Sequence, residues 1–391
     1  MTVTSPAQTR VVAAQRATYA AFIGSGVVFA SWASRIPQVR DHLHLSPAQL
    51  GLVLLSIAAG SIVATPLAGV IVHRFTSGRT VAGMSALTCA MLGVVAVGFL
   101  IGVVPVVAGL SIFGFGYGAW DVAMNVQGAT VERHLGRSIM PRFHAGYSVG
   151  TVIGALIGAV MVAVHVPVTA HLLVIAVVVA VVVPLEVRRF LPDTDDGEPV
   201  AHGGALSRWR EPRTLMIGLF VLTFAFTEGT GNDWISVALI DGHGTPAVIG
   251  TLGFATFLAA MTIARWFGTA LLDRFGRVSV VRALAVLAAV GLVLFVFGGW
   301  TPVAFVGALL WGFGASLGFP VGMSAAADDP AAAPTRVSAV GSIAYCAFLG
   351  GPPVVGFLGD RFDVLHAMLS VAGLLAVSLL LAGALRPLER R

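Results

Sequence analysis

Three ionisable residues lie inside apolar stretches that are long enough to cross a bilayer: Asp121, Glu228 and Arg265. A charged side chain near the bilayer centre costs about 2.5–3.5 kcal/mol on insertion scales, so each needs a partner or a water-filled cavity. Burial favours the neutral form of a carboxylate. Asp121 and Glu228 are therefore candidate proton carriers or solute contacts, and the alternative is a structural carboxylate hydrogen-bonded between helices.

Small and polar residues recur at helical spacing around Asp121. The stripe consists of Gly114, Gly118, Asp121, Asn125, Gly128 and Glu132. Such a face is poorly suited to lipid. The spacing therefore predicts that Asp121 and Asn125 line the wall of a cavity.

A second polar segment surrounds Glu228, between Thr227 and Trp234. Gly229 and Gly231 interrupt it, which predicts a locally irregular helix of the kind tolerated where it lines a cavity. Glu228 and Asn232 share one face if the helix is regular instead. We expect both residues to belong to the cavity.

Arg265 must meet a carboxylate, a group of carbonyl oxygens or an anionic solute. Asp121 and Glu228 are the candidate carboxylates, and an anionic solute stays open as an alternative. Arg35 and Asp233 lie at similar depth near the opposite membrane surface. We predict that they pair to close an outer gate; the alternative is that both sit among lipid headgroups.

Aromatic residues flank these positions, and we include them with His144 among the cavity candidates. They are Trp32, Trp120, Trp234 and Trp266. Their rings could stack on a ring-bearing solute or serve as packing and interface anchors. His144 could sense pH or could be a hydrogen-bonded packing residue. Glycine at every fourth position from 146 to 158 predicts a groove for a neighbouring helix.

The composition determines the environment in which these residues work. The chain has 391 residues, of which 57% are hydrophobic and 10% charged, whereas soluble proteins carry about 25% charged residues. This excludes disordered, disulfide-stapled and ordinary soluble proteins. All 23 basic residues are arginines, clustered between apolar runs rather than on one face, which excludes a nucleic-acid-binding protein. The chain is predicted to be an all-α membrane protein.

Twelve apolar runs are long enough for transmembrane helices. They lie near 17–36, 47–72, 80–101, 104–127, 143–164, 168–187, 214–239, 246–272, 278–299, 301–326, 337–358 and 364–385. All arginines except Arg35, Arg40, Arg265 and Arg361 then fall on one side, which predicts that both termini are cytoplasmic. A polar linker over 191–212 is predicted to separate two six-helix halves, 1–190 and 213–391.

The two halves resemble each other at a nearly constant offset. Ser46-Pro47 matches Thr245-Pro246, and Gly69 matches Gly268. Residues 114–116 and 312–314 also match, both reading Gly, Phe, Gly. Independent helix starts could explain one such match, but three favour a duplicated six-helix unit.

The loop after the eighth span reads Asp273-Arg274-Phe275-Gly276-Arg277, which resembles the loop signature of the major facilitator superfamily. A degenerate copy in the first half contains His73, Arg74 and Arg79, with His in place of the usual Asp. Residues 120–125 and 140–145 resemble the branch near the fucose-permease-like transporters. The first span nevertheless lacks the carboxylate that fucose-type proton symporters carry there.

The resemblance implies two pseudo-symmetric six-helix bundles that rock around a central cavity. It also implies that the charged residues of the two loops switch contacts between states. We therefore expect a non-enzymatic, secondary active transporter of the plasma (inner) membrane, a monomer without cofactor or metal, whose partners are a small solute, protons and lipid.

Two rival functions stay open. One is a drug or metabolite efflux antiporter, which loses support because the Gly-Pro pair of drug–proton antiporters is absent from the fifth span. The other is a transporter-like sensor that binds its ligand without moving it.

No nucleotide-binding loop is present, so an ion gradient is the expected energy source.

Overall fold

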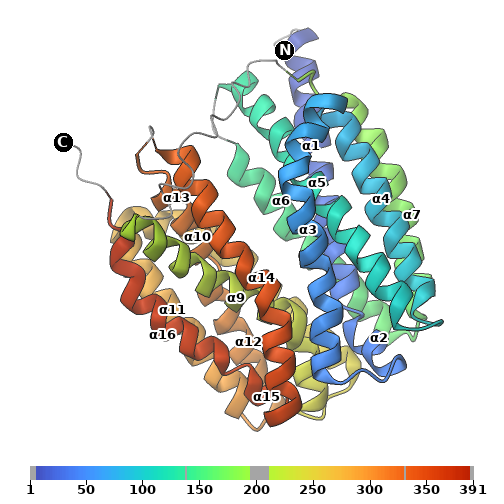
Figure 1. Cartoon of the computed structure of the whole chain (residues 1–391), viewed down its shortest axis with the longest axis vertical. Coiled ribbons are helices and arrows are strands. Elements are labelled where there is room, and N and C mark those ends of the chain that lie inside the picture. Colours follow the sequence, from blue (N-terminus) through green and yellow to red (C-terminus); the bar gives the residue numbers. More distant parts are fainter. Residues whose placement is uncertain (1–5, 137–138, 194–210, 330–331, 388–391) are drawn as a thin grey trace, which may run out of the picture. The chain divides into compact units, whose positions relative to one another are not determined.

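The computed structural model describes residues 6–136, 139–193, 211–329 and 332–387, and within these ranges all regular structure is helical (Figure 1). Two compact units divide the chain: Met1–Leu45 with Val53–Asp196, and Ser46–Leu52 with Gly197–Arg391. The predicted all-α class is confirmed. Most of the predicted linker, residues 194–210, lies outside the described residues.

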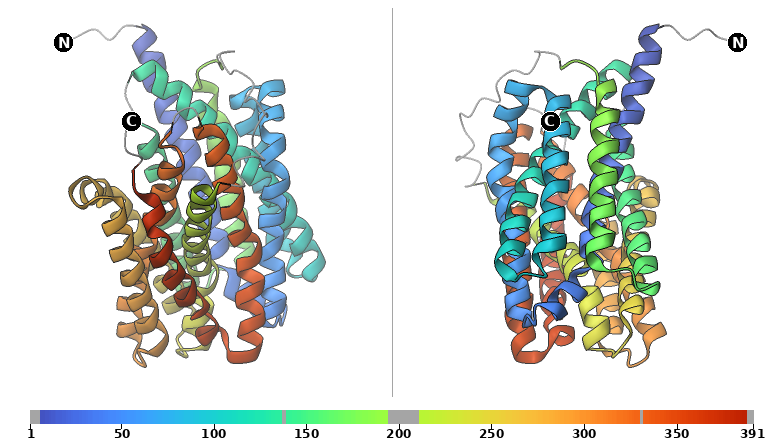
Figure 2. Two further views of the ribbon diagram at one scale, coloured as in Figure 1. Left: turned by 60° about the vertical axis from the view of Figure 1, so that its left-hand side comes forward. Right: turned by 90° about the vertical axis from the view of Figure 1, so that its right-hand side faces the viewer.

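The first unit is built from seven α-helices and a short 3-10 helix, as far as the chain is described. They are α1 (Pro6–Ala33), α2 (Ile36–His42), α3 (Pro47–Phe75), α4 (Ser77–Gly98), α5 (Val103–Leu135), α6 (Met140–Ala163), α7 (Val168–Glu186) and η1 (Val187–Arg189). Helices α4 and α7 lie side by side (Figure 1, Figure 2). The first turns of α3 belong to the second unit by their contacts.

The second unit follows the same plan with more interruptions. Its described helices are α9 (Pro212–Asp241), α10 (Ala247–Phe275), α11 (Arg277–Phe297), α12 (Thr301–Ala315), α13 (Gly318–Ala326), α14 (Ala333–Phe362), α15 (Val364–Ala367), α16 (Ser370–Leu381) and η2 (Ala382–Leu385). Helix α9 packs against α14 and α10, and α11 packs against α12.

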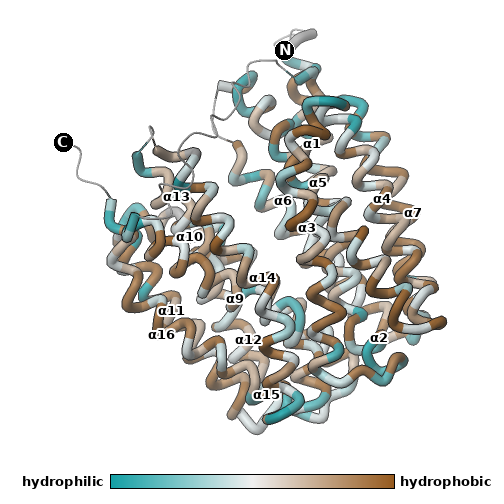
Figure 3. Tube along the Cα trace, viewed as in Figure 1, coloured by the Kyte–Doolittle hydropathy of each residue, from teal (hydrophilic) through white to brown (hydrophobic). Residues whose placement is uncertain are grey.

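Eleven helices or helix pairs of the described chain are long and apolar enough to cross a membrane. Helix α1 is as long as the others, with 28 residues, but is not among these eleven, because its N-terminal half carries Arg10, Gln15 and Arg16. It packs against α5, α6 and α7. The hydrophobic colour in Figure 3 runs along the helices, and hydrophilic residues gather at their ends.

Glycines allow α1 and α6 to approach each other closely. A Cβ atom on Gly150 would lie 2.2 Å from the Ile23 carbonyl oxygen, and one on Gly26 would lie 2.3 Å from the Tyr147 carbonyl oxygen. Only glycine fits such backbone contacts. The groove predicted from the glycine spacing of the fifth span is confirmed, and α1 occupies it.

The predicted irregularity of the seventh span is wrong. Helix α9 is continuous from Pro212 to Asp241. Its glycines make room for aromatic rings instead, because a Cβ atom on Gly231 would lie 2.5 Å from Phe257 Cζ. The break in this unit lies in the tenth span, at Ser316 and Leu317 between α12 and α13.

Candidate functional site

Arg265 and Glu228 form an ion pair within the second unit. The Arg265 Nη2 atom of α10 lies 2.8 Å from Glu228 Oε2 of α9, and the two side chains are 26% and 18% exposed. Arg265 Nε also donates to the Ser316 carbonyl at the break between α12 and α13, at 3.1 Å. Among the partners considered from the sequence, Arg265 therefore meets both a carboxylate and a carbonyl oxygen.

Two further polar residues of α9, Asn232 and Asp233, follow Glu228 and lie on different faces of the helix. Asn232 follows Glu228 by one turn, so the two share a face, as expected for a regular helix. The buried Asn232 Oδ1 atom has no hydrogen-bond donor among the described residues. Asp233 is half-buried and has no described hydrogen bond or ion pair.

The structure separates the four candidate tryptophans. Trp32, Trp120 and Trp234 are at most 1% exposed and pack in the interior of their units. Trp266 is 62% exposed, and its neighbour Phe267 is exposed as well. The buried Nε1 atoms of the first three have no hydrogen-bond partner among the described residues, and their place in the cavity stays a prediction. Trp266 has the surroundings of a lipid-facing or interface ring.

Asp121 is partnered by an amide rather than by a cation. Asn125 Nδ2 lies 3.3 Å from Asp121 Oδ1 and donates to the Asp121 carbonyl at 2.8 Å. Within the described residues, Asp121 has no ion pair. Gly114 and Gly118 lie on the same face of the continuous helix α5 as Asp121 and Asn125, and both glycines pack against the backbone of α3.

Two tyrosines complete the surroundings of Asp121, and sequence reasoning missed both. The Tyr117 hydroxyl donates to the Tyr147 hydroxyl at 3.2 Å. Tyr117 precedes Asp121 by one turn of α5, and its hydroxyl meets that of Tyr147 of α6. The signal available in the sequence was the i, i+4 spacing of Tyr117, Asp121 and Asn125.

His144 lies on α6 three residues before Tyr147. Its ring meets the edge of Phe22, with the ring centroids 5.2 Å apart. This aromatic contact agrees with the packing interpretation of His144.

Arg35 lies between α1 and α2 and is 2% exposed. Its Nε donates to His171 Nδ1 at 2.9 Å, and its Nη2 donates to the Val166 carbonyl at 3.1 Å. Because Nδ1 accepts this bond, His171 is neutral and carries its proton on Nε2. Burial contradicts a headgroup position for Arg35, and the Arg35–Asp233 pair stays a prediction.

The loop residues of the second unit divide into paired and exposed side chains. Arg277 Nη1 lies 2.6 Å from Asp328 Oδ1, and Arg213 Nη2 lies 2.9 Å from Asp328 Oδ2. Asp273 and Arg274 are exposed, and Arg274 lies over the Phe275 ring. Asp328, between the tenth and eleventh spans, was missed, although a carboxylate there is notable in a chain with 18 acidic residues.

The corresponding loop of the first unit is held differently. His73, Arg74 and Arg79 are exposed. The start of α4 is capped instead by Asp193, which accepts from the Ser77 backbone N–H at 2.6 Å and from its hydroxyl at 2.5 Å. A carboxylate at a helix N-terminus is favourable because it meets unpaired N–H groups and the positive end of the helix dipole.

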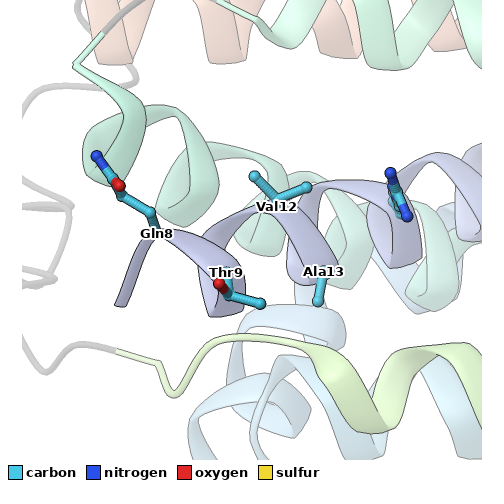
Figure 4. Close-up of a pocket in the computed structure, with 5 residues that line it drawn as sticks. Gln8, Thr9, Val12 and Ala13 are labelled. Atoms are coloured by element: carbon cyan, nitrogen blue, oxygen red, sulfur yellow. The ribbon is translucent and has the colours of Figure 1, made fainter. Parts of the chain in front are cut away.

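A shallow hollow of about 300 Å³ lies at the N-terminal end of α1, lined by Gln8, Thr9, Val12, Ala13 and Arg16 (Figure 4). It contains none of the carboxylates described above. No cluster of three or more His, Cys, Asp or Glu side chains suited to a metal ion occurs in the described part of the chain. The charged and hydroxyl groups within the spans are therefore the candidate site.

The sequence matches the model of the Major Facilitator Superfamily over residues 17–240 and 221–391. The chain belongs to this superfamily. It is 32% identical over 354 residues to an uncharacterized transporter, y4wD, of Sinorhizobium fredii, covering 90% of this chain and 92% of the relative. It is 30% identical over 366 residues to an uncharacterized MFS-type transporter of Yersinia pestis, covering 93% and 94%.

Solved structures share the fold. A mutant of the nucleoside transporter NupG superimposes with a TM-score of 0.77 at 15% identity, covering 94% of this chain and 98% of that one. A variant of the E. coli fucose:proton symporter FucP gives 0.64 at 18% identity, covering 95% and 98%. The chain is therefore a multi-pass membrane transporter with the twelve-helix fold, and not an enzyme.

Proposed function

We propose that this transporter moves a small solute across the bacterial inner membrane by alternating access and is driven by protons that bind Asp121. The two units are the two bundles of this mechanism, and both termini face the cytoplasm. The observation that carries the proposal is the contrast between the two intramembrane carboxylates. Glu228 has a cation 2.8 Å away, whereas Asp121 has an amide partner.

The contrast assigns different roles to the two residues. Glu228 forms a charge-assisted ion pair with Arg265, so a cation already occupies this carboxylate in the described structure. Asp121 has no such cation among the described residues, and its described side-chain partner is the amide of Asn125. Protonation of Asp121 removes a negative charge from helix α5 of the first unit. This change can shift the balance between the inward-open and outward-open states.

The experiment is solute flux into proteoliposomes at controlled internal and external pH. Thermal-shift screening of the purified protein against sugars, organic anions and cationic drugs first identifies the solute. We expect an imposed proton gradient to drive flux in the wild type. Asp121→Asn should abolish this dependence while solute still shifts the unfolding temperature.

A matched control is Glu186→Gln, which removes a carboxylate from an exposed pair with Arg189. It should leave the proton dependence unchanged. Proton-driven flux that persists in Asp121→Asn would overturn the assigned coupling. Binding without flux under any gradient would favour a sensor, and proton-driven flux out of the compartment equivalent to the cytoplasm would favour an efflux antiporter.

A further inference from the structure

The carbonyl oxygen that binds Arg265 is available because of a proline. In a helix, the carbonyl of Ser316 would accept a hydrogen bond from the backbone N–H four residues later. That residue is Pro320, which has no N–H. The helical hydrogen bonds resume only with Val321, which donates to the Leu317 carbonyl at 3.0 Å.

The Ser316 side chain is not the group that holds Arg265. Its hydroxyl donates to the Phe313 carbonyl at 2.7 Å, whereas its backbone carbonyl accepts from Arg265 Nε at 3.1 Å. The anchor of the guanidinium is therefore a backbone atom, which no side-chain substitution at position 316 removes.

Glycines allow the break between α12 and α13 to pack closely against α9 and α10, the two helices that carry Glu228 and Arg265. A Cβ atom on Gly268, one turn after Arg265, would lie 2.4 Å from Leu317 Cδ1. A Cβ atom on Gly318 would lie 2.0 Å from Phe224, which precedes Glu228 by one turn of α9. The break thus packs beside both charged residues, and a side chain at either glycine would push it away.

We propose that Pro320 is a positioning residue for the charged site. By leaving the Ser316 carbonyl without its helical donor, it gives Arg265 Nε a fixed acceptor, and the planar guanidinium then directs Nη2 at Glu228. The inference rests on the proposed function only in counting Arg265 as part of the transport site.

The test is a mutant cycle followed by thermal unfolding of the purified full-length protein. In the wild-type background, Glu228→Gln and Arg265→Gln should lower the unfolding temperature non-additively by several degrees, because each breaks the same pair. Pro320→Ala restores an N–H at position 320, which can reclaim the Ser316 carbonyl. In that background the non-additivity should fall by half or more.

Two matched controls separate this effect from general damage. Pro184→Ala removes a proline inside α7 of the other unit, and Ser316→Ala removes only the hydroxyl. Both should leave the non-additivity between positions 228 and 265 unchanged. The same non-additivity in Pro320→Ala as in the wild type would overturn the proposal.

A second variant keeps the proposal testable if Pro320→Ala does not fold. Arg265→Lys keeps the charge but replaces the forked guanidinium with a single ammonium, which cannot hold both acceptors in the same geometry. The lowering of the unfolding temperature by Arg265→Lys and by Glu228→Gln should therefore be closer to additive than that of the Arg265→Gln and Glu228→Gln pair. Non-additivity as large as in the Arg265→Gln cycle would contradict the anchoring role. The unfolding experiment requires no solute. It can therefore contradict the role of Pro320 while flux still depends on Asp121, and it can support that role while flux does not depend on Asp121.

Discussion

Asp328 accepts from Arg277 at 2.6 Å, so the first residue of α11 is tied to the loop between α13 and α14. The other oxygen of the same carboxylate binds Arg213 at 2.9 Å. Arg213 also donates to the Ala384 carbonyl at 3.1 Å. The Asp328 carboxylate, 11% exposed, therefore joins its own loop to α11 and α9, and Arg213 extends the network to η2.

Asp328→Asn should destabilise the protein by about 1–3 kcal/mol, because two arginines lose their shared, largely buried anion. The comparison is Asp273→Asn in the loop signature itself. Asp273 is exposed and has no described ion pair, so its change should stay within about 0.5 kcal/mol. Chemical or thermal unfolding of both variants measures the difference, and equal losses would contradict the bridging role of Asp328.

The two members of the Arg265–Glu228 pair should not be equally costly to remove. Arg265→Gln leaves a carboxylate that can take up a proton and become neutral, whereas Glu228→Gln leaves a guanidinium that stays charged. We expect Glu228→Gln to lower the stability by about 1 kcal/mol more than Arg265→Gln at neutral pH. Unfolding at pH 7 checks the order, and the opposite order would show that water already solvates the arginine.

The hydrogen bond between Tyr117 and Tyr147 predicts non-additive substitutions. Tyr117→Phe and Tyr147→Phe should each cost about 1 kcal/mol of stability, and the double variant should cost little more than one of them. Tyr19→Phe is the control, because the described contact of Tyr19 is an edge-on ring contact with Phe143, which phenylalanine preserves. Additive losses in unfolding experiments would show that the two hydroxyls act independently.

The packing of α1 against α6 depends on the absence of a side chain at Gly150. Gly150→Ala should destabilise the first unit by about 1–3 kcal/mol, since its Cβ atom would overlap the Ile23 carbonyl. Gly83→Ala, at a helical position of α4 with open space around it, should be neutral or stabilising by up to about 1 kcal/mol. Thermal unfolding of the two variants decides, and tolerance of both would contradict the close approach of α1 and α6.

The environment and the span pattern of this protein could be established from the order of its residues. A bilayer demands long apolar helices with satisfied backbone groups, and that requirement leaves a local record in hydropathy. Close helix packing leaves a similar record in glycine spacing, so the groove that receives α1 was predictable. The seventh span shows the limit, because Gly229 and Gly231 indicated a break where the structure uses Gly231 to accommodate Phe257.

Partner choice was decided by the tertiary structure. The sequence left Asp121, Glu228 and an anionic solute as alternatives for Arg265, and the packing of α9 against α10 selected Glu228, 37 residues away. In the same way, the packing of the first unit brings Arg35 within hydrogen-bonding distance of His171, which is 136 residues away in the sequence. The depth of a charge in the membrane follows from a fixed rise per residue, whereas its partner depends on which helix faces meet, and no local spacing encodes that.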